Sequence, residues 1–79
     1  MYTVYVLKLT EKKRWYVGVT GNIARRLKEH RCGMVKSTKG RFDGLVYTER
    51  FDVKSEAWKR EKWLKSGQGR EWLEEKLNL

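Results

Sequence analysis

The chain contains no proline, one cysteine and no long apolar run. A single cysteine excludes a disulfide framework and a zinc site built only from thiolates. The apolar runs are too short to span a bilayer, and the chain does not open with a charged segment followed by an apolar one, as a secretion signal would. We therefore expect a cytoplasmic protein with no membrane partner.

Acidic residues are also scarce relative to basic ones. The 79 residues include 19 Lys or Arg and 10 Asp or Glu, which gives a formal net charge of +9. A surface this basic predicts an anionic partner, and nucleic acid is the default expectation. The charge alone does not distinguish a protein that binds nucleic acid from one that cuts it.

No repeat, linker or low-complexity stretch divides the sequence, so we expect residues 1–79 to form a single domain. A domain of this size buries only about 60% of the surface of its unfolded chain, so its stability depends on large side chains. Four Trp, four Tyr and two Phe can supply that apolar area.

The pattern of apolar, aromatic and polar residues predicts the element order β-β-α-β-α-α. The predicted strands cover residues 2–9, 14–20 and 45–51, and the predicted helices cover residues 23–31, 54–66 and 69–77. The polar connection from Thr10 to Lys13 has hairpin length, so the first two strands should pair antiparallel. This order predicts an α+β fold in which helices flank a small three-stranded antiparallel sheet.

One carboxylate in the second predicted helix lies among apolar positions. At about 100° per residue, Glu61 falls on the same arc as Ala57 and Leu64. A carboxylate in such a position is normally paired or holds a cation. Two interpretations are open here. Glu61 either pairs with an arginine such as Arg26, or it binds Mg²⁺, which needs only one or two carboxylates beside water and phosphate.

The first predicted helix carries two ionisable groups beside its apolar face. His30 lies on the core-facing arc, and Arg26 stands four positions before it. Arg25 and Glu29 are spaced for an ion pair on the solvated side. A lone histidine near a core is usually a structural hydrogen-bonding group, but two ionisable groups together indicate a lined cleft.

The hairpin predicts that two tyrosines share one face of the sheet. If residues 10–13 form the loop, Leu7 pairs with Tyr16 and Tyr5 pairs with Gly18, which makes the tyrosines diagonal neighbours. A shift of one residue would place them on opposite faces. A glycine inside a strand often marks close approach by a ligand or another backbone, so Gly18 is a structural candidate. Taken alone, these are ordinary features of a sheet.

Together these positions resemble the motifs of the GIY-YIG nuclease family. Thr3-Val4-Tyr5 resembles the GIY element, with Thr in place of its Gly, and Tyr16-Val17-Gly18 resembles the YIG element. Residues 22–30 resemble the helix that carries the family's Arg and His, and residues 59–62 resemble the segment with its metal-binding Glu. The resemblance covers nearly the whole chain and implies the fold of a small single-domain member.

The resemblance also implies roles for five site residues. Tyr16, Tyr5 and His30 would orient or deprotonate the attacking water. Arg26 would stabilise charge on the scissile phosphate, and Glu61 would hold one Mg²⁺ or Mn²⁺. Three basic residues after the first predicted helix are candidates for contacts with nucleic-acid phosphates: Lys36, Lys39 and Arg41.

Two positions depart from the family's pattern. Val19 stands where many members have Lys, and Leu73 where many have Asn, which bears on rate and substrate fit more than on fold. The leading hypothesis is a metal-dependent DNA endonuclease of repair or recombination, directed by DNA structure or by a partner protein rather than by sequence. Two alternatives are a nucleic-acid-binding module that cuts weakly or not at all, and an RNA-binding accessory protein.

Overall fold

The computed structural model describes residues 1–10 and 14–77, apart from the side chain of Ser37. In chain order the elements are β1 Tyr2–Leu9, β2 Trp15–Thr20, α1 Ile23–Arg31, the 3-10 helix η1 Lys36–Thr38, β3 Phe42–Phe51, α2 Lys54–Lys65 and α3 Gly67–Leu77. The predicted element order and α+β fold are confirmed. No helix in this part of the chain is long and apolar enough to cross a membrane.

The sheet has the strand order β2-β1-β3, and both neighbouring pairs are antiparallel. Leu7 lies opposite Tyr16 and Tyr5 lies opposite Gly18, which confirms the register predicted from the hairpin. Residues 11–13 of the predicted hairpin connection lie outside the described residues. Because facing residues of an antiparallel pair share one side of the sheet, Tyr5 and Tyr16 do so here.

β3 begins at Phe42, three residues before the predicted start. The added segment contains Asp43 and Gly44, residue types that strands normally lack, which is why the pattern did not indicate a strand there. The pairing of β3 with β1 shifts register twice, and these irregularities let the longer strand follow β1 to Leu9. Tertiary pairing with the central strand therefore overrides local propensity.

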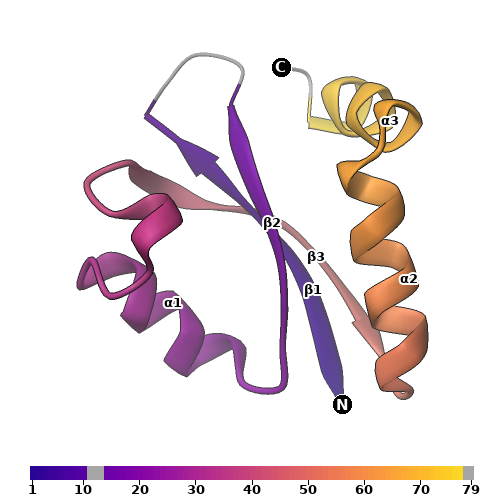
Figure 1. Cartoon of the computed structure of the whole chain (residues 1–79), viewed down its shortest axis with the longest axis horizontal. Helices are drawn as coiled ribbons and strands as arrows, with labels where there is room; N and C mark the ends of the chain where they lie inside the picture. Colours follow the sequence, from indigo (N-terminus) through magenta and orange to yellow (C-terminus); the bar gives the residue numbers. More distant parts are fainter. Residues whose placement is uncertain (11–13, 78–79) are drawn as a thin grey trace.

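Helices cover both faces of the sheet, with α1 on one face and α2 and α3 on the other (Figure 1). β1 is the central strand, so both of its faces are covered. Val4, Tyr5 and Val6 accordingly all have 0% exposure. Since successive side chains alternate between the faces, Val4 and Val6 face α2 and α3, while Tyr5 faces α1.

The apolar core lies between the sheet and the pair α2 and α3. Its buried members are Val4, Val6, Val17, Ala57, Leu64 and Leu73. Partly buried aromatic residues from β1, β2, β3, α2 and α3 pack around this cluster. Leu73, one of the two departures from the family's pattern, has 0% exposure, so its position contributes to packing.

An arginine joins α2 and α3 to the outer strand β3. The Nε and Nη2 atoms of Arg60 donate to the two carboxylate oxygens of Glu49 at 2.9 and 3.0 Å. The guanidinium lies 4.6 and 4.9 Å from the ring centroids of Trp63 and Trp72. We call these four residues the Arg60 clamp. Bidentate pairing combined with stacking is a geometry that a planar guanidinium supports well, so the clamp holds the Arg60 side of α2 against β3.

α3 approaches α2 so closely that Gly69 has no room for a side chain. A Cβ at Gly69 would overlap the carbonyl oxygen of Trp63 and lie 2.5 Å from Cα of Leu64. Because these are backbone atoms, Gly69→Ala should lower the free energy of unfolding by about 1–3 kcal/mol. This corresponds to a fall in Tm of roughly 5–20 °C, measured by thermal unfolding.

Gly67→Ala is the matched control for this substitution. Gly67 lies two positions earlier in the same helix, and a Cβ there meets nothing within 4 Å. This variant should unfold at the wild-type temperature or slightly above it. Equal melting of the two alanine variants would contradict the close packing of α3 on α2.

Candidate active site

On the α1 face of the sheet, four of the five predicted catalytic side chains gather around one hydroxyl group. The hydroxyl of Tyr5 accepts a hydrogen bond from Nε of Arg26 at 3.3 Å and lies 3.0 Å from Nε2 of His30. The ring centroid of Tyr16 lies 6.2 Å from that of Tyr5 and 5.2 Å from that of His30. We call these four residues the Tyr5 cluster.

The β1–β2 hairpin and α1 bring the Tyr5 cluster together. The hairpin register places both tyrosines on the α1 face, and α1 contributes Arg26 and His30 one helical turn apart. Asn22 caps the N-terminus of α1, because its side chain accepts the backbone N–H of Arg25 at 3.0 Å. The helix ends before Gly33, which has the left-handed φ of +73° that favours glycine.

Gly18 leaves the space that the Tyr5 ring occupies. A Cβ at Gly18 would lie 2.6 Å from both Cζ and the hydroxyl oxygen of Tyr5. The sequence predicted close approach by a ligand or by another backbone, whereas the group that approaches is a side chain of the neighbouring strand. Gly18 therefore determines where the Tyr5 hydroxyl lies.

The hydrogen bonds continue from His30 to a residue that the sequence did not indicate. Nδ1 of His30 lies 2.7 Å from the Thr38 hydroxyl, which donates to the carbonyl oxygen of Val35 at 3.4 Å. Thr38 has one proton to donate, so it accepts from Nδ1–H, and Nε2 of His30 is left to accept from Tyr5. The donors therefore run in one direction, from Arg26 to Tyr5, then to His30 and Thr38.

Burial divides the Tyr5 cluster into an inner and an outer pair. Tyr5 and His30 have 0% and 1% exposure. Tyr16 is only half-buried, and the Arg26 side chain is 35% exposed. Solvent therefore reaches Tyr16 and Arg26, while Tyr5 and His30 lie behind them.

The environment of the inner pair sets its protonation. Burial raises the pKa of Tyr5 to about 12, although the hydrogen bond from Arg26 acts in the opposite direction. Burial and, secondarily, the charge of Arg26 lower the pKa of His30, with Glu29 opposing. Near neutral pH Tyr5 is therefore protonated and His30 is neutral, as the direction of the hydrogen bonds requires.

Arg26 has a different carboxylate partner from those expected. Its Nη1 donates to Oε1 of Glu29 at 3.0 Å, and the hydrogen bonds to Tyr5 and Glu29 both raise the pKa of Arg26. The predicted ion pair of Arg25 with Glu29 is therefore wrong, because Glu29 pairs with Arg26, three positions before it, instead of with Arg25, four positions before it. The interpretation that Glu61 pairs with Arg26 is also wrong, since Glu61 lies on α2 and pairs with Lys65.

Glu61 lies at the β2 side of α2 and is 25% exposed. The Arg60 clamp turns Arg60 toward β3, and Glu61 follows about 100° further round the helix. Its Oε2 atom lies 3.4 Å from Nζ of Lys65. Exposed i,i+4 pairs of this kind contribute only about 0.3–0.5 kcal/mol, so a stronger ligand can displace Lys65. Within the described residues, Glu61 makes no hydrogen bond or ion pair to the Tyr5 cluster.

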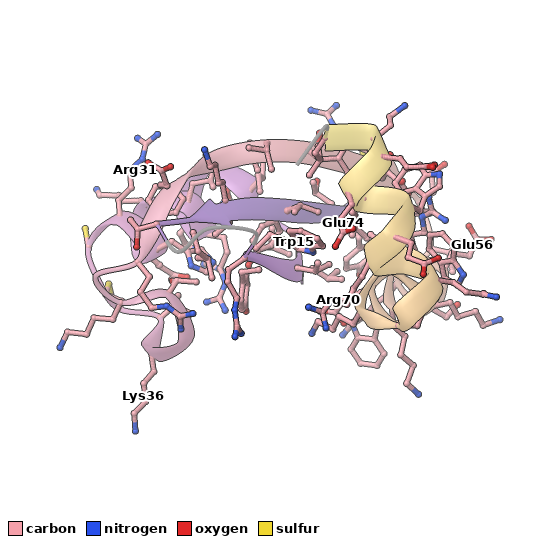
Figure 2. All side chains as sticks on the ribbon, turned by 90° about the horizontal axis from the view of Figure 1, so that it is seen from above. Trp15, Arg31, Lys36, Glu56, Arg70 and Glu74 are labelled. Carbon is pink, nitrogen blue, oxygen red and sulfur yellow. The ribbon has the colours of Figure 1, made fainter. Side chains whose placement is uncertain are left out.

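A cavity at the outer edge of β2 links Tyr16 with this side of α2. The β2 cavity has a volume of about 320 Å³ and is lined by Trp15, Tyr16, Val17, Leu64, Lys65 and Arg70. Figure 2 shows Arg70 beside Trp15 in this region. Tyr16 and Lys65, the ion-pair partner of Glu61, therefore border the same hollow.

The donor set at Glu61 fits one kind of metal ion. Residues 1–10 and 14–77 contain no group of three or more His, Cys, Asp or Glu that could hold a metal. A small hard ion such as Mg²⁺ needs fewer protein ligands, because water and substrate phosphate fill its other positions. The partly exposed carboxylate of Glu61, paired only with a lysine, suits an ion of this kind.

The predicted phosphate-binding residues lie in η1 or within three residues after it. Lys36 and Lys39 are exposed, and the half-buried Arg41 donates its backbone N–H to the carbonyl oxygen of Thr38 at 2.9 Å. Figure 2 shows Lys36 at one end of the molecule, well away from Arg70. These basic residues therefore lie outside the Tyr5 cluster, on the segment whose Thr38 binds His30.

The fold and the Tyr5 cluster define a GIY-YIG catalytic domain, and the model of that family matches residues 1–77. The chain therefore belongs to the GIY-YIG nuclease family, as its motifs predicted. Nucleic acid as the class of substrate and dependence on a divalent metal are general properties of that family.

Proteins named UPF0213 are among its relatives. One from Natronomonas pharaonis is 48% identical over 65 residues, which cover 80% of this chain and 75% of the relative. One from Halobacterium salinarum is 43% identical over 63 residues, which cover 77% of this chain and 80% of the relative. The solution NMR structure of a UPF0213 protein from Bacillus halodurans is 39% identical, with a TM-score of 0.51, and covers 92% of this chain and 82% of that one.

Gly18→Ala should displace the Tyr5 hydroxyl, because a Cβ would lie 2.6 Å from it. The expected loss of unfolding free energy is about 1–3 kcal/mol. The chain has one histidine, so the imidazole signals in an NMR spectrum belong to His30 and should shift in this variant. In the control Gly21→Ala, where a Cβ meets nothing within 4 Å, they should stay in place. An unchanged His30 spectrum in Gly18→Ala would disprove the contact.

The lowered pKa of His30 makes stability depend on pH. The folded state binds this proton less readily than the unfolded state, whose histidine titrates near pH 6.5. The contribution of His30 is therefore fully present above about pH 6.5 and decreases as the pH falls toward its folded pKa. In urea unfolding, the stability advantage of wild type over His30→Gln should be smaller at acidic than at neutral pH. An NMR titration midpoint of His30 above about 6.5 would reverse this sign.

Proposed function

We propose that the chain is a metal-dependent endonuclease that hydrolyses phosphodiester bonds in DNA and is directed by DNA structure rather than by sequence. The observation that carries this proposal is the Tyr5 cluster, in which a charged arginine and a tyrosine reach solvent in front of a buried, hydrogen-bonded pair. Family membership supplies the reaction class. The β2 cavity, bordered by Tyr16 and by the partner of Glu61, supports a site at this edge of the sheet.

The outer pair would contact the substrate. Arg26 is charged and partly exposed, so its guanidinium can pair with phosphate oxygens and stabilise the charge that builds on them. The hydroxyl of Tyr16 would orient the attacking water. Both groups are accessible without any movement of the backbone.

The inner pair would position the outer one. The Tyr5 hydroxyl accepts the hydrogen bond from Nε of Arg26 and donates its own to His30, so neither group is available to take a proton from water in this arrangement. Thr38 fixes the tautomer of His30 from the other side. The roles that the family resemblance implies for Tyr5 and His30 are thus proposed here as positioning roles.

In the reaction, the water oxygen attacks phosphorus and the bond from phosphorus to the 3′ oxygen breaks. One proton of that water ends on the leaving oxygen and its oxygen stays on phosphorus, which gives 5′-phosphate and 3′-hydroxyl ends. A divalent ion held by Glu61 would polarise the phosphate and stabilise the leaving oxygen.

Basic side chains around the β2 edge support recognition by shape. Lys65 and Arg70 line the β2 cavity, and they are suited to phosphate contacts, which carry no sequence information. Branched or partly single-stranded DNA, as formed in repair and recombination, is the substrate class that we propose, with a partner protein as a source of further targeting.

Cleavage of branched and linear DNA with Mg²⁺ or Mn²⁺ tests this function. Tyr16→Phe, Arg26→Lys and Glu61→Gln should each lower the rate by roughly 100-fold or more, since each removes a group proposed to act on the transition state. Glu56→Gln is the matched control, because Glu56 is exposed in the first turn of the same helix as Glu61. It should cut like wild type.

Two results would count against the proposed function. If Tyr16→Phe and Glu61→Gln cut as fast as wild type, the site is wrongly assigned. If no substrate is cut with either metal while salt-sensitive binding to DNA remains, the chain is a binding module on the same fold.

A further inference from the structure

Trp58 is the exposed tryptophan of α2. Its side chain is 56% exposed, whereas Trp15, Trp63 and Trp72 pack against the apolar core. The Nζ atom of Lys54 lies 4.9 Å from the Trp58 ring centroid, so the ring is already in contact with a cation. A single exposed apolar residue is common on protein surfaces, so the surroundings of Trp58 decide what it indicates.

A second hollow joins Trp58 to the proposed metal ligand. This hollow, the Trp58 pocket, has a volume of about 390 Å³ and is lined by Ser55, Trp58, Lys59, Glu61 and Lys62. The indole ring and the carboxylate of Glu61 therefore share one depression, and two lysines stand at its sides. A depression bordered by an aromatic ring and several ammonium groups favours a ligand that combines a flat ring with negative charge.

The same side of α2 leads from the Trp58 pocket to the β2 cavity. Residues 54, 58, 61 and 65 are spaced by three or four positions, so they form one stripe along the helix. The stripe ends at Lys65, which pairs with Glu61 and lines the β2 cavity with Tyr16 and Arg70. From Trp58 to Lys65 the helix rises about 10 Å.

We propose that this stripe of α2 holds an unpaired stretch of the DNA strand that is cut, with one nucleobase stacked on Trp58. Phosphates on either side would contact Lys59 and Lys62, and the strand would continue past Glu61 into the β2 cavity. In a duplex the faces of the bases are covered by their neighbours, so only an unpaired base offers its face to the indole. The inference rests on the proposed function in naming DNA, and it specifies a single-stranded segment beside the cut.

Binding measured without divalent metal tests this inference separately from cleavage. The probes are a short oligothymidylate, an abasic strand of the same length that keeps the phosphates, and a duplex of that length. Trp58→Ala should bind the oligothymidylate about 5- to 150-fold more weakly than wild type, since the stacking of one base is lost. Trp58→Phe keeps an aromatic ring and should retain most of the affinity.

The abasic strand and a control variant make the result specific. Wild type and Trp58→Ala should bind the abasic strand equally, because no base is present to stack. Their affinities for the duplex should also agree. Leu45→Ala removes another exposed apolar side chain, 41% exposed on β3, and should bind all three probes like wild type.

Two outcomes would overturn the inference. If Trp58→Ala loses affinity equally for all three probes, the ring acts through folding or charge rather than by stacking. If Trp58→Ala binds every probe like wild type, no base stacks on the ring, and the surface either binds a protein partner or is simply exposed to solvent. Even if Trp58→Ala were unfolded, wild type would still have to prefer the oligothymidylate to the abasic strand. Trp58-dependent binding by a chain that cuts no DNA would contradict the proposed function and the position of the cut, but not the stacking of an unpaired base on Trp58.

Discussion

The buried hydroxyl of Tyr5 is the polar group on which the α1 side of the molecule depends. It lies on the central strand, where water does not reach it, so it needs partners within the protein. Arg26 and His30 supply them, and Thr38 in turn supplies the partner of His30. His30 is the buried residue of α1, so these hydrogen bonds connect that helix to the sheet. Among the described residues, no buried side-chain nitrogen or oxygen lacks a partner.

The two faces of the sheet therefore have different roles, one in apolar packing and one in holding the Tyr5 cluster. The face under α2 and α3 carries the aliphatic core, whose burial stabilises the fold, and the Arg60 clamp. The face under α1 carries polar groups whose spacing matters more than their volume. β1 serves both, because alternate side chains of one buried strand enter the core and the Tyr5 cluster. A small domain can in this way hold a candidate active site without opening a hole in its core.

Much of this arrangement could be predicted from the sequence. The strand over residues 2–9 and the helix over residues 23–31 have the predicted bounds, and the hairpin register follows from loop length alone. The start of β3 could not be predicted, because Asp and Gly there oppose a strand until β1 pairs with them. Thr38 could not be found either, since only the folded position of η1 brings it to His30. For Glu61, helical periodicity indicated a position beside Ala57 and Leu64 on α2, but the choice of Lys65 as its partner depends on side-chain packing.

The Arg60 clamp constrains which residues can vary in the sequence as well as how α2 packs. It lies on the side of α2 away from Glu61, yet it fixes the angle at which the helix is rolled against the sheet, and so the direction in which Glu61 and Trp58 face. A substitution at Arg60 would leave Glu61 in place in the sequence while changing the direction in which its side chain faces. Variation at Glu49, Trp63 and Trp72 should then be constrained together with the site, even though these residues lie outside the Tyr5 cluster.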